Sequence, residues 1–433
     1  MLMRRLEARK VSPYCPARSR ERLLMGGMLL ALAAFGPWAT PDAHAAQKPK
    51  VRAITAFVKL DRGRYQAQIA ATLKFLRSAR TEFERGGYTV QSLRITTQPF
   101  PEYIRGLSRQ EALEFFQAYD RLAQQESFAA NIGPAMLHDA DDPGAAELLS
   151  EILSTTKTLG ASLVIADDDG IHWKAVRATA KLLKVVEEHS PHSQGNFNFA
   201  ATAMLAPFAP FYPGSYHTSE GRRFSVATEG ANVVEEVFAA TSHDPVAAAQ
   251  ALREAFTQHA RGLESIARKV EKQSGRTYMG LDETPAPLRD VSIGAAIEKF
   301  TGAPFGSSGT MTSAALITGA LRTLPVKQVG FSGLMVPVLE DNLLARRWDE
   351  GRYNIDSLLA YSAVCGTGLD TIPLPGDVTE EQLGRILGDM AALAFKWKKP
   401  LSARLLPVYG KRAGDRTEFD DPFLANATIK PLP

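Results

Sequence analysis

Apolar residues recur along this chain at two spacings, and the two spacings alternate. Continuous apolar runs such as residues 51–58 (VRAITAFV) and 162–166 (SLVIA) are typical of buried strands. Between such runs, apolar residues three or four positions apart predict amphipathic helices, as in residues 65–85, where Leu73 and Leu76 share one face. Alternation of this kind favours an α/β fold with a largely parallel sheet, either open or closed.

The same pattern gives about ten strands and about ten helices, with no repeat or long linker between them. The clearest strands are expected at residues 51–58, 88–96, 128–132, 162–166, 196–205, 223–228, 326–331 and 402–409. The clearest helices are expected at residues 65–85, 108–124, 143–159, 172–188, 233–240, 245–272, 293–300 and 310–321. Capping-box patterns mark two helix starts, at Ser108 and at Thr379, and residues 356–364 fit either a helix or a buried strand.

Charge is nearly balanced outside the N-terminal segment. Residues 1–45 hold 7 Lys and Arg against 3 Asp and Glu, which leaves 43 basic and 44 acidic residues in the remainder. No basic patch therefore indicates nucleic acid as a partner. Residues 46–433 are expected to form a single domain that binds a small-molecule ligand. The sequence is compatible with either a monomer or an oligomer.

The N-terminal segment predicts export. Arg18, Arg20 and Arg22 precede an apolar run at residues 23–38, and Ala-His-Ala at 43–45 resembles a cleavage site. This arrangement describes a signal peptide over residues 1–45, cleaved near Ala45. The run is too short for a membrane span, so a periplasmic or secreted protein with no stable span is expected. A cytoplasmic protein with an apolar extension is the alternative.

One cysteine, Cys365, lies outside that leader, so no internal disulfide is expected in the mature chain. A lone thiol is either a small buried hydrophobe or a site residue. It lies in a glycine-rich stretch, residues 330–377, that also carries several carboxylates. The catalytic hypothesis combines Cys365 as nucleophile with Asp370 and His217 as proton-transfer groups.

Two further groups of residues suit ligands. A glycine-rich turn before the helix at 310–321 offers free N–H groups to a phosphate or carboxylate, although an ordinary capped turn explains it equally well. The expected anion-binding residues are Gly306, Ser307, Ser308, Gly309, Thr310 and Arg404. Glu340, Asp341 and Asp377 are a speculative set of ligands for a divalent cation, with helix capping and ion pairing as alternatives. No P-loop, HExxH or CxxC motif is present, so the sequence favours neither a nucleotide site nor a structural zinc site.

Several segments together resemble a known family. They are RITTQPFPE (94–102), FYPGSYH (211–217), SIGAAIEKFTGAPFGSSGT (292–310), GFSGLMVPVLED (330–341), YSAVCGTGLDTIPLPGD (361–377) and KPLSARLLPVYGKRAGDRTEFDDPFLAN (399–426). The chain is similar, over about residues 51–429, to a pyruvate-formate-lyase-like family of unknown function in bacteria and archaea. The resemblance implies a single ten-stranded α/β barrel like that of glycyl-radical enzymes.

The resemblance does not extend to radical chemistry. Glycyl-radical enzymes carry an Arg-Val-x-Gly-Tyr type motif near the C-terminus, whereas the glycines available here are Gly410 in VYGK and Gly414 in RAGD. Two hypotheses follow. The first is a barrel enzyme that acts on a small anionic substrate with the loop cysteine and acidic residues. The second is a non-catalytic envelope protein that binds a small molecule or a divalent cation. The enzyme hypothesis leads by analogy with other barrels.

Overall fold

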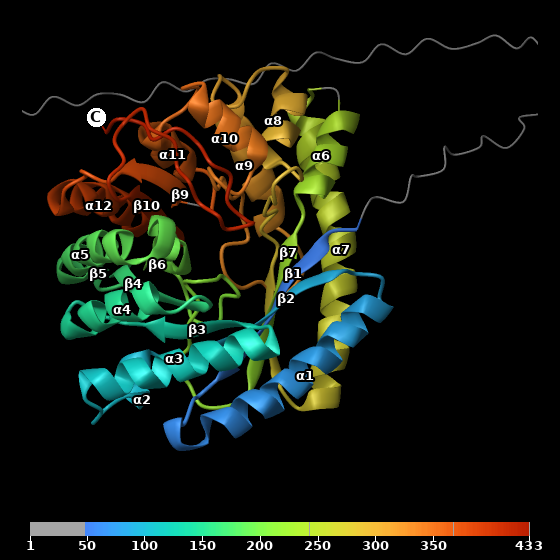
Figure 1. Ribbon diagram of the computed structural model, residues 1–433. Coiled ribbons are helices and arrows are strands. Elements are labelled where there is room, and N and C mark those ends of the chain that lie inside the picture. Colours follow the sequence, from blue (N-terminus) through green and yellow to red (C-terminus); the bar gives the residue numbers. More distant parts are fainter. Residues whose placement is uncertain (1–47, 242, 367, 433) are drawn as a thin grey trace, which may run out of the picture. The chain divides into compact units, whose positions relative to one another are not determined.

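The computed structural model describes residues 48–241, 243–366 and 368–432 (Figure 1). Residues Ala46–Pro433 form one unit by their internal contacts. The predicted leader, residues 1–45, lies outside the described residues. Among the helices of the described ranges, none combines the length and the apolar character that crossing a membrane would require.

One mixed sheet organises the described part of the chain, and it confirms the predicted α/β fold. The strand order is β8-β7-β1-β2-β3-β4-β6-β10-β9, with the short β5 paired to β4. The strands are β1 (Lys50–Val58), β2 (Val90–Thr97), β3 (Ala129–Pro134), β4 (Leu159–Asp167), β5 (Gly170–Ile171), β6 (Phe199–Ala203), β7 (Arg223–Glu229), β8 (Thr277–Asp282), β9 (Gly368–Pro375) and β10 (Leu401–Val408). Five central strands, β1, β2, β3, β4 and β6, are parallel. A parallel pair borders them on each side, β7 with β8 and β10 with β9. Each pair runs antiparallel to the central strands, since β7 is antiparallel to β1 and β10 is antiparallel to β6.

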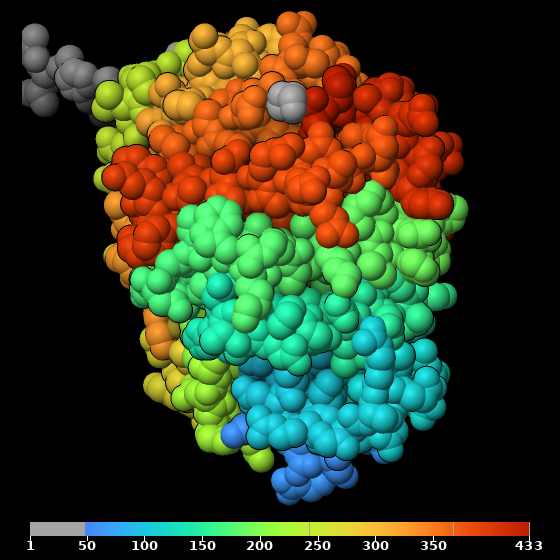
Figure 2. All heavy atoms as spheres, turned by 90° about the vertical axis from the view of Figure 1, so that its left-hand side faces the viewer, coloured from blue at the N-terminus to red at the C-terminus, as the bar shows by residue number. Residues whose placement is uncertain are grey.

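The helices lie along the outside of this sheet (Figure 1). They are α1 (Tyr65–Arg85), α2 (Phe100–Tyr103), α3 (Arg109–Glu126), α4 (Gly144–Thr155), α5 (Trp173–His189), α6 (Ala231–Ala240), α7 (Pro245–Ser274), α8 (Ile293–Thr301), α9 (Thr310–Arg322), α10 (Asn342–Asp349), α11 (Ile355–Ser362) and α12 (Glu380–Trp397). Both capping boxes form as predicted, at Ser108 and Thr379. Figure 2 shows the side on which the C-terminal segments, the α4–α5 region and the α3 region follow one another across the surface.

The two faces of the sheet differ in chemistry, as β2 illustrates. Leu93 and Ile95 are buried in the hydrophobic core. Arg94 and Thr96, at the alternating positions, hydrogen-bond instead to the loop of residues 204–217. Because successive side chains of a strand point to opposite faces, the second face of the sheet is polar and is covered by this loop.

The edge strands β8 and β9 are bridged by the segment of residues 327–339. Leu281 of β8 donates to Lys327 O (2.8 Å), and Val338 donates to Asp370 O of β9 (3.0 Å). These contacts are isolated bridges, so the segment is not a strand and the predicted strand at 326–331 is wrong. The ten-stranded sheet is therefore established, whereas closure of a barrel is not confirmed.

Candidate functional site

A small cavity lies where the loop 204–217 and the segment 327–339 meet the polar face of the sheet. Its volume is about 70 Å³. Its charged lining residues are Arg52, Arg94, Asp282, Glu340, Asp370 and Arg404. A larger hollow of about 800 Å³ runs along α7, but it is open and is lined by side chains of that helix alone. The inner cavity is the better candidate because it gathers buried charges from separate strands.

A chain of ion pairs crosses the cavity wall. Arg404 of β10 binds Asp370 of β9 through Nε and Glu340 through Nη2. The other oxygen of Glu340 accepts from Arg52 Nη2 (3.1 Å), and Arg52 Nη1 donates to Glu229 of β7 (3.0 Å). The five groups alternate in sign, so each interior charge has an opposite charge on both sides. Through Glu340, the network links strands β9 and β10 to strands β1 and β7.

Asp370 retains an uncommitted oxygen within this network. Its side chain is 1% exposed, and its Oδ2 atom has no hydrogen-bond partner among the described residues. Burial raises the pKa of Asp370, against the lowering effect of Arg404. Burial also opposes the charge on Arg404, yet Asp370 and Glu340 together raise its pKa. The arginine therefore stays charged, and the carboxyl group is the member of the pair that can exchange a proton.

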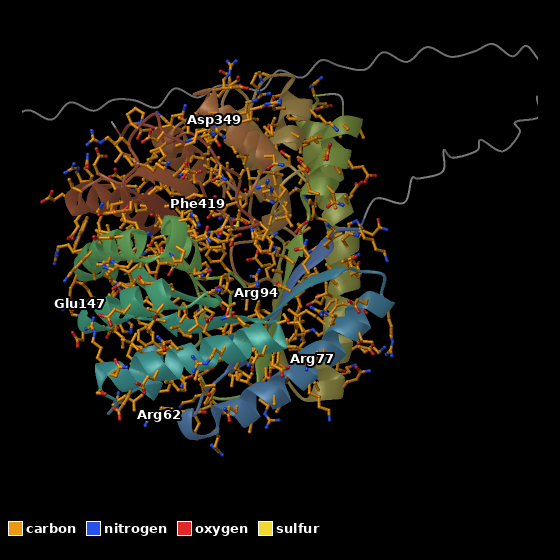
Figure 3. The ribbon with its side chains drawn as sticks, in the orientation of Figure 1. Arg62, Arg77, Arg94, Glu147, Asp349 and Phe419 are labelled. Carbon is orange, nitrogen blue, oxygen red and sulfur yellow. The ribbon has the colours of Figure 1, made fainter. Side chains whose placement is uncertain are left out.

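Arg94 is the cation of the cavity that has no carboxylate of its own. It lies near the centre of the molecule on β2 (Figure 3). Its Nη1 donates to Pro210 O (2.9 Å), and its guanidinium lies 5.8 Å from the centre of the Tyr212 ring. No ion pair to Arg94 is found within the described ranges. Burial lowers the pKa of Arg94 to about 9, so the guanidinium keeps its charge at neutral pH.

An apolar cover closes one side of the cavity. Phe331 and Met335 pack with residues of the 204–217 loop, and the rings of Phe331 and Phe211 meet edge to face at 5.0 Å. Asp282 fixes the turn that presents Phe331, because its carboxylate accepts from the N–H groups of Phe331 and Ser332, both at 3.0 Å. The preceding residue must be glycine: Gly330 has φ +76°, and a Cβ there would lie 2.1 Å from Asp282 Oδ2.

Comparison with known proteins places the chain in a family. Residues 44–420 match the family described as "Uncharacterised ACR (DUF711)". The chain belongs to this family. Its relatives are named UPF0210 proteins and occur in archaea and bacteria. The description of the family names no activity, so the resemblance inferred from the sequence is confirmed as membership and leaves the reaction open.

The relatives match most of the chain at moderate identity. The protein of Pyrobaculum arsenaticum is 31% identical over 350 residues, which are 76% of each chain. That of Acetivibrio thermocellus is 27% identical over 355 residues, 77% of each chain. Among solved structures, the anaerobic ribonucleotide reductase of Thermotoga maritima in complex with dATP and CTP is 9% identical, covers 82% of this chain and 75% of its own, and has a TM-score of 0.38. A similarity with a TM-score this low supports no conclusion about fold or function.

The predicted export is corrected by these comparisons. The relatives in this DUF711 family are described only as UPF0210 proteins, and none of those cited is described as exported or periplasmic. The family model begins at residue 44, beyond the segment on which the prediction rested. The comparisons therefore give no support to the predicted signal peptide and export, and neither enters the function proposed below.

The structure separates the predicted catalytic trio. Asp370 lines the cavity, but Cys365 is 1% exposed and belongs to the hydrophobic core. His217 is held by Val58 O (2.9 Å) and Ser219 O (3.1 Å), and burial lowers its pKa. Neither Cys365 nor His217 lines the cavity. The reason is backbone position: Asp370 lies inside β9, whereas Cys365 lies in the bend before that strand and is buried in the hydrophobic core.

The predicted anion-binding set is also divided. Arg404 lies in the cavity, whereas residues 306–310 form a turn at the start of α9 that is absent from the cavity lining. Thr310 Oγ1 accepts from Gly306 N (3.1 Å), so the turn binds its own hydroxyl. Ser307 O accepts from Thr310 N, and Ser308 and Gly309 are exposed. The alternative of an ordinary capped turn describes this segment.

The speculative metal ligands do not converge. Glu340 binds two arginines, while Asp341, the next residue, accepts from Leu343 N (2.9 Å) and caps α10. Asp377 is exposed. In the part of the chain that the structure describes, no three His, Cys, Asp or Glu side chains are arranged to hold a metal ion. Glu340 ends a turn and is committed to the ion pairs, whereas Asp341 is committed to the start of α10.

The cavity is also lined by three residues that were not predicted from the sequence, Arg52, Arg94 and Tyr212. A signal was present for the arginines. Each of Arg52, Arg94 and Arg404 is the one charged residue in an otherwise apolar or small-residue run, VRAITAFV, SLRIT or SARLL. A charge is rarely buried in such a run unless it has a partner, so charged residues from different strands should be sought together.

Proposed function

We propose that this DUF711 protein is an enzyme that acts on a small anionic substrate in the inner cavity, with Arg94 binding the anion. The observation that carries the proposal is the state of Arg94. Arginine has five N–H donors in a planar fork, and one hydrogen bond, to Pro210 O, accounts for Arg94 within the described structure. A partly buried guanidinium with free donors suits a carboxylate or phosphate, which it binds with two parallel hydrogen bonds.

Asp370 supplies the second chemical group. Its raised pKa and its free Oδ2 suit general acid or base catalysis on a substrate held by Arg94. Arg404 and Glu340 hold the carboxyl group in place, because Arg404 bonds both. The apolar cover of Phe211, Phe331 and Met335 limits water around the reacting groups and strengthens each charge interaction.

Binding of small anions to matched variants tests the anion site. We expect acetate, lactate or phosphate to raise the unfolding temperature of the wild-type protein, since a ligand at 100 times its Kd adds about 2.7 kcal/mol of stability. R94Q should lose this response, and R94K should keep only part of it because lysine lacks the fork. R77Q is the control, as Arg77 is an exposed arginine paired with Glu126. An undiminished response in R94Q would refute the anion site.

A non-catalytic binding protein is the second candidate, and the rigidity of the wall favours it. Arg52 and Arg404 each pair with two carboxylates, which leaves the charged wall little freedom to follow a reaction. NMR can separate the two candidates by following the exchange of hydrogen atoms on the carbon atoms of the ligand for deuterium in D2O. An enzyme that uses Asp370 should show exchange that D370N abolishes while anion binding persists. Binding without exchange in the wild-type protein would favour the binding function.

A further inference from the structure

We infer that the ligand of the inner cavity is a two- or three-carbon carboxylate that carries a hydrogen-bond donor, a hydroxyl or an ammonium group, on the carbon next to the carboxylate. This inference rests on the proposed anion site and names the class of molecule that fills it. Three features support it: the size of the cavity, the two uncommitted groups at its wall, and the charges that surround them.

Cavity size sets the length of the ligand. One water molecule needs roughly 10–15 Å³ of such space, so the cavity of about 70 Å³ holds about five to seven water-sized groups. A two-carbon acid with one further substituent has five non-hydrogen atoms, and a three-carbon acid has six. Nucleotides and sugar phosphates have more non-hydrogen atoms than this, so the volume of the cavity favours the smaller acids.

Among the described residues that line the cavity, one cation lacks a carboxylate partner and one buried carboxylate oxygen lacks a donor. Arg404 uses Nε and Nη2 on carboxylates, Arg52 uses both Nη atoms, and both oxygens of Glu340 accept from these arginines. In the described structure Arg94 keeps N–H donors without a carboxylate, and Asp370 keeps Oδ2 without a donor. A single small ligand satisfies both when its carboxylate meets Arg94 and its donor meets Asp370.

The surrounding charges exclude close relatives of this class. A second carboxylate on the ligand would add a negative charge beside Glu340 and Asp370, which are 4% and 1% exposed. A 2-oxo acid presents only acceptors, and it would leave Asp370 Oδ2 facing another oxygen. A simple acid such as propionate satisfies Arg94 but leaves that oxygen buried and unbonded, which is costly.

Calorimetric titration of the full chain with four acids of nearly equal size tests the inference. The acids are lactate, alanine, propionate and pyruvate. We expect lactate or alanine to bind at least about tenfold more tightly than propionate and pyruvate, as a hydrogen bond to a charged group provides. Lactate above alanine identifies a hydroxyl ligand, and alanine above lactate identifies an ammonium ligand.

The D370N variant sharpens the result. The asparagine side chain of D370N can donate a hydrogen bond through its amide nitrogen where the carboxylate oxygen of Asp370 accepts one. Lactate and alanine should therefore no longer bind more tightly than the other acids, and pyruvate should bind better than it does to the wild-type protein. Equal binding of propionate and lactate, lost in R94Q, would overturn the ligand class and leave the anion site intact. No binding of any of the four acids at millimolar concentration would overturn both. The wild-type panel decides between these outcomes by itself if D370N does not fold.

Discussion

The buried carboxyl group of Glu283 makes a measurable contribution to how the stability of the protein depends on pH. Glu283 follows β8, is 0% exposed, and has one oxygen bonded to Thr228 Oγ1 (3.2 Å) and one with no partner among the described residues. Burial, and to a lesser degree Asp282, raises its pKa to about 8. At neutral pH the side chain is therefore protonated in the native protein and ionised in the unfolded chain.

This difference makes the native protein lose stability as the pH rises. Between an unfolded pKa of about 4.3 and the native value, folding takes up one proton at this site, so the free energy of unfolding falls by about 1.4 kcal/mol per pH unit. From pH 5 to pH 8 the loss from Glu283 is about 4 kcal/mol. The E283Q variant keeps an acceptor for Thr228 and cannot ionise, so it should escape this loss.

Urea denaturation at pH 5, 6, 7 and 8 measures the effect. The stability of E283Q relative to wild type should grow with pH and level off above the native pKa, because titrations shared by both proteins cancel in the difference. E84Q is the control for the change in net charge, since Glu84 is exposed on α1. Parallel stability curves for wild type and E283Q would refute the buried, protonated state.

Three further outcomes are expected. R404M should lose about 3–5 kcal/mol in urea denaturation at pH 7, since it leaves the buried Asp370 without an ion pair and Glu340 with Arg52 alone. R77M, at an exposed pair, should lose at most about 1 kcal/mol, and similar losses in the two variants would contradict the buried network. G330A should cost about 1–3 kcal/mol more than G351A, because both glycines have positive φ but only the first meets a neighbouring atom. Alkylation of Cys365, followed by mass spectrometry, should require denaturant, and rapid labelling of native protein would place the thiol outside the core.

The sequence predicted most of the sheet and helices because their signals are local. Residues 65–85 gave the helix α1 at its observed bounds, and the Ser108 box opened α3 as expected. β9 was missed because Gly368, Pro373 and Pro375 are typical of loops. Proline is tolerated there because β9 is an edge strand, where an absent N–H need not break a ladder. Edge position is a tertiary property that no local pattern reveals.

The site was only partly predictable for a related reason. Glu340, Asp370 and Arg404 stood out as individual residues, but nothing local shows that Arg404 lies between the other two. That pairing depends on β9 and β10 being neighbours and on residues 327–339 reaching β9. Cys365 attracted attention by its rarity, which is a property of composition, whereas its burial in the hydrophobic core is a property of the tertiary structure.

The buried ion pairs themselves argue that the cavity has a use. Replacing a buried ion network with apolar side chains of similar volume is often neutral or stabilising by 1–4 kcal/mol, so stability alone does not require Arg52, Glu340, Arg404 and Asp370. The network lines a cavity in which the guanidinium of Arg94 has no ion pair among the described residues. Fixed charges around such a cation are the arrangement expected of the proposed anion site, because they would need no rearrangement when a ligand binds. Substitutions in the network should therefore reduce ligand affinity even though they leave the contact between Arg94 and the ligand in place.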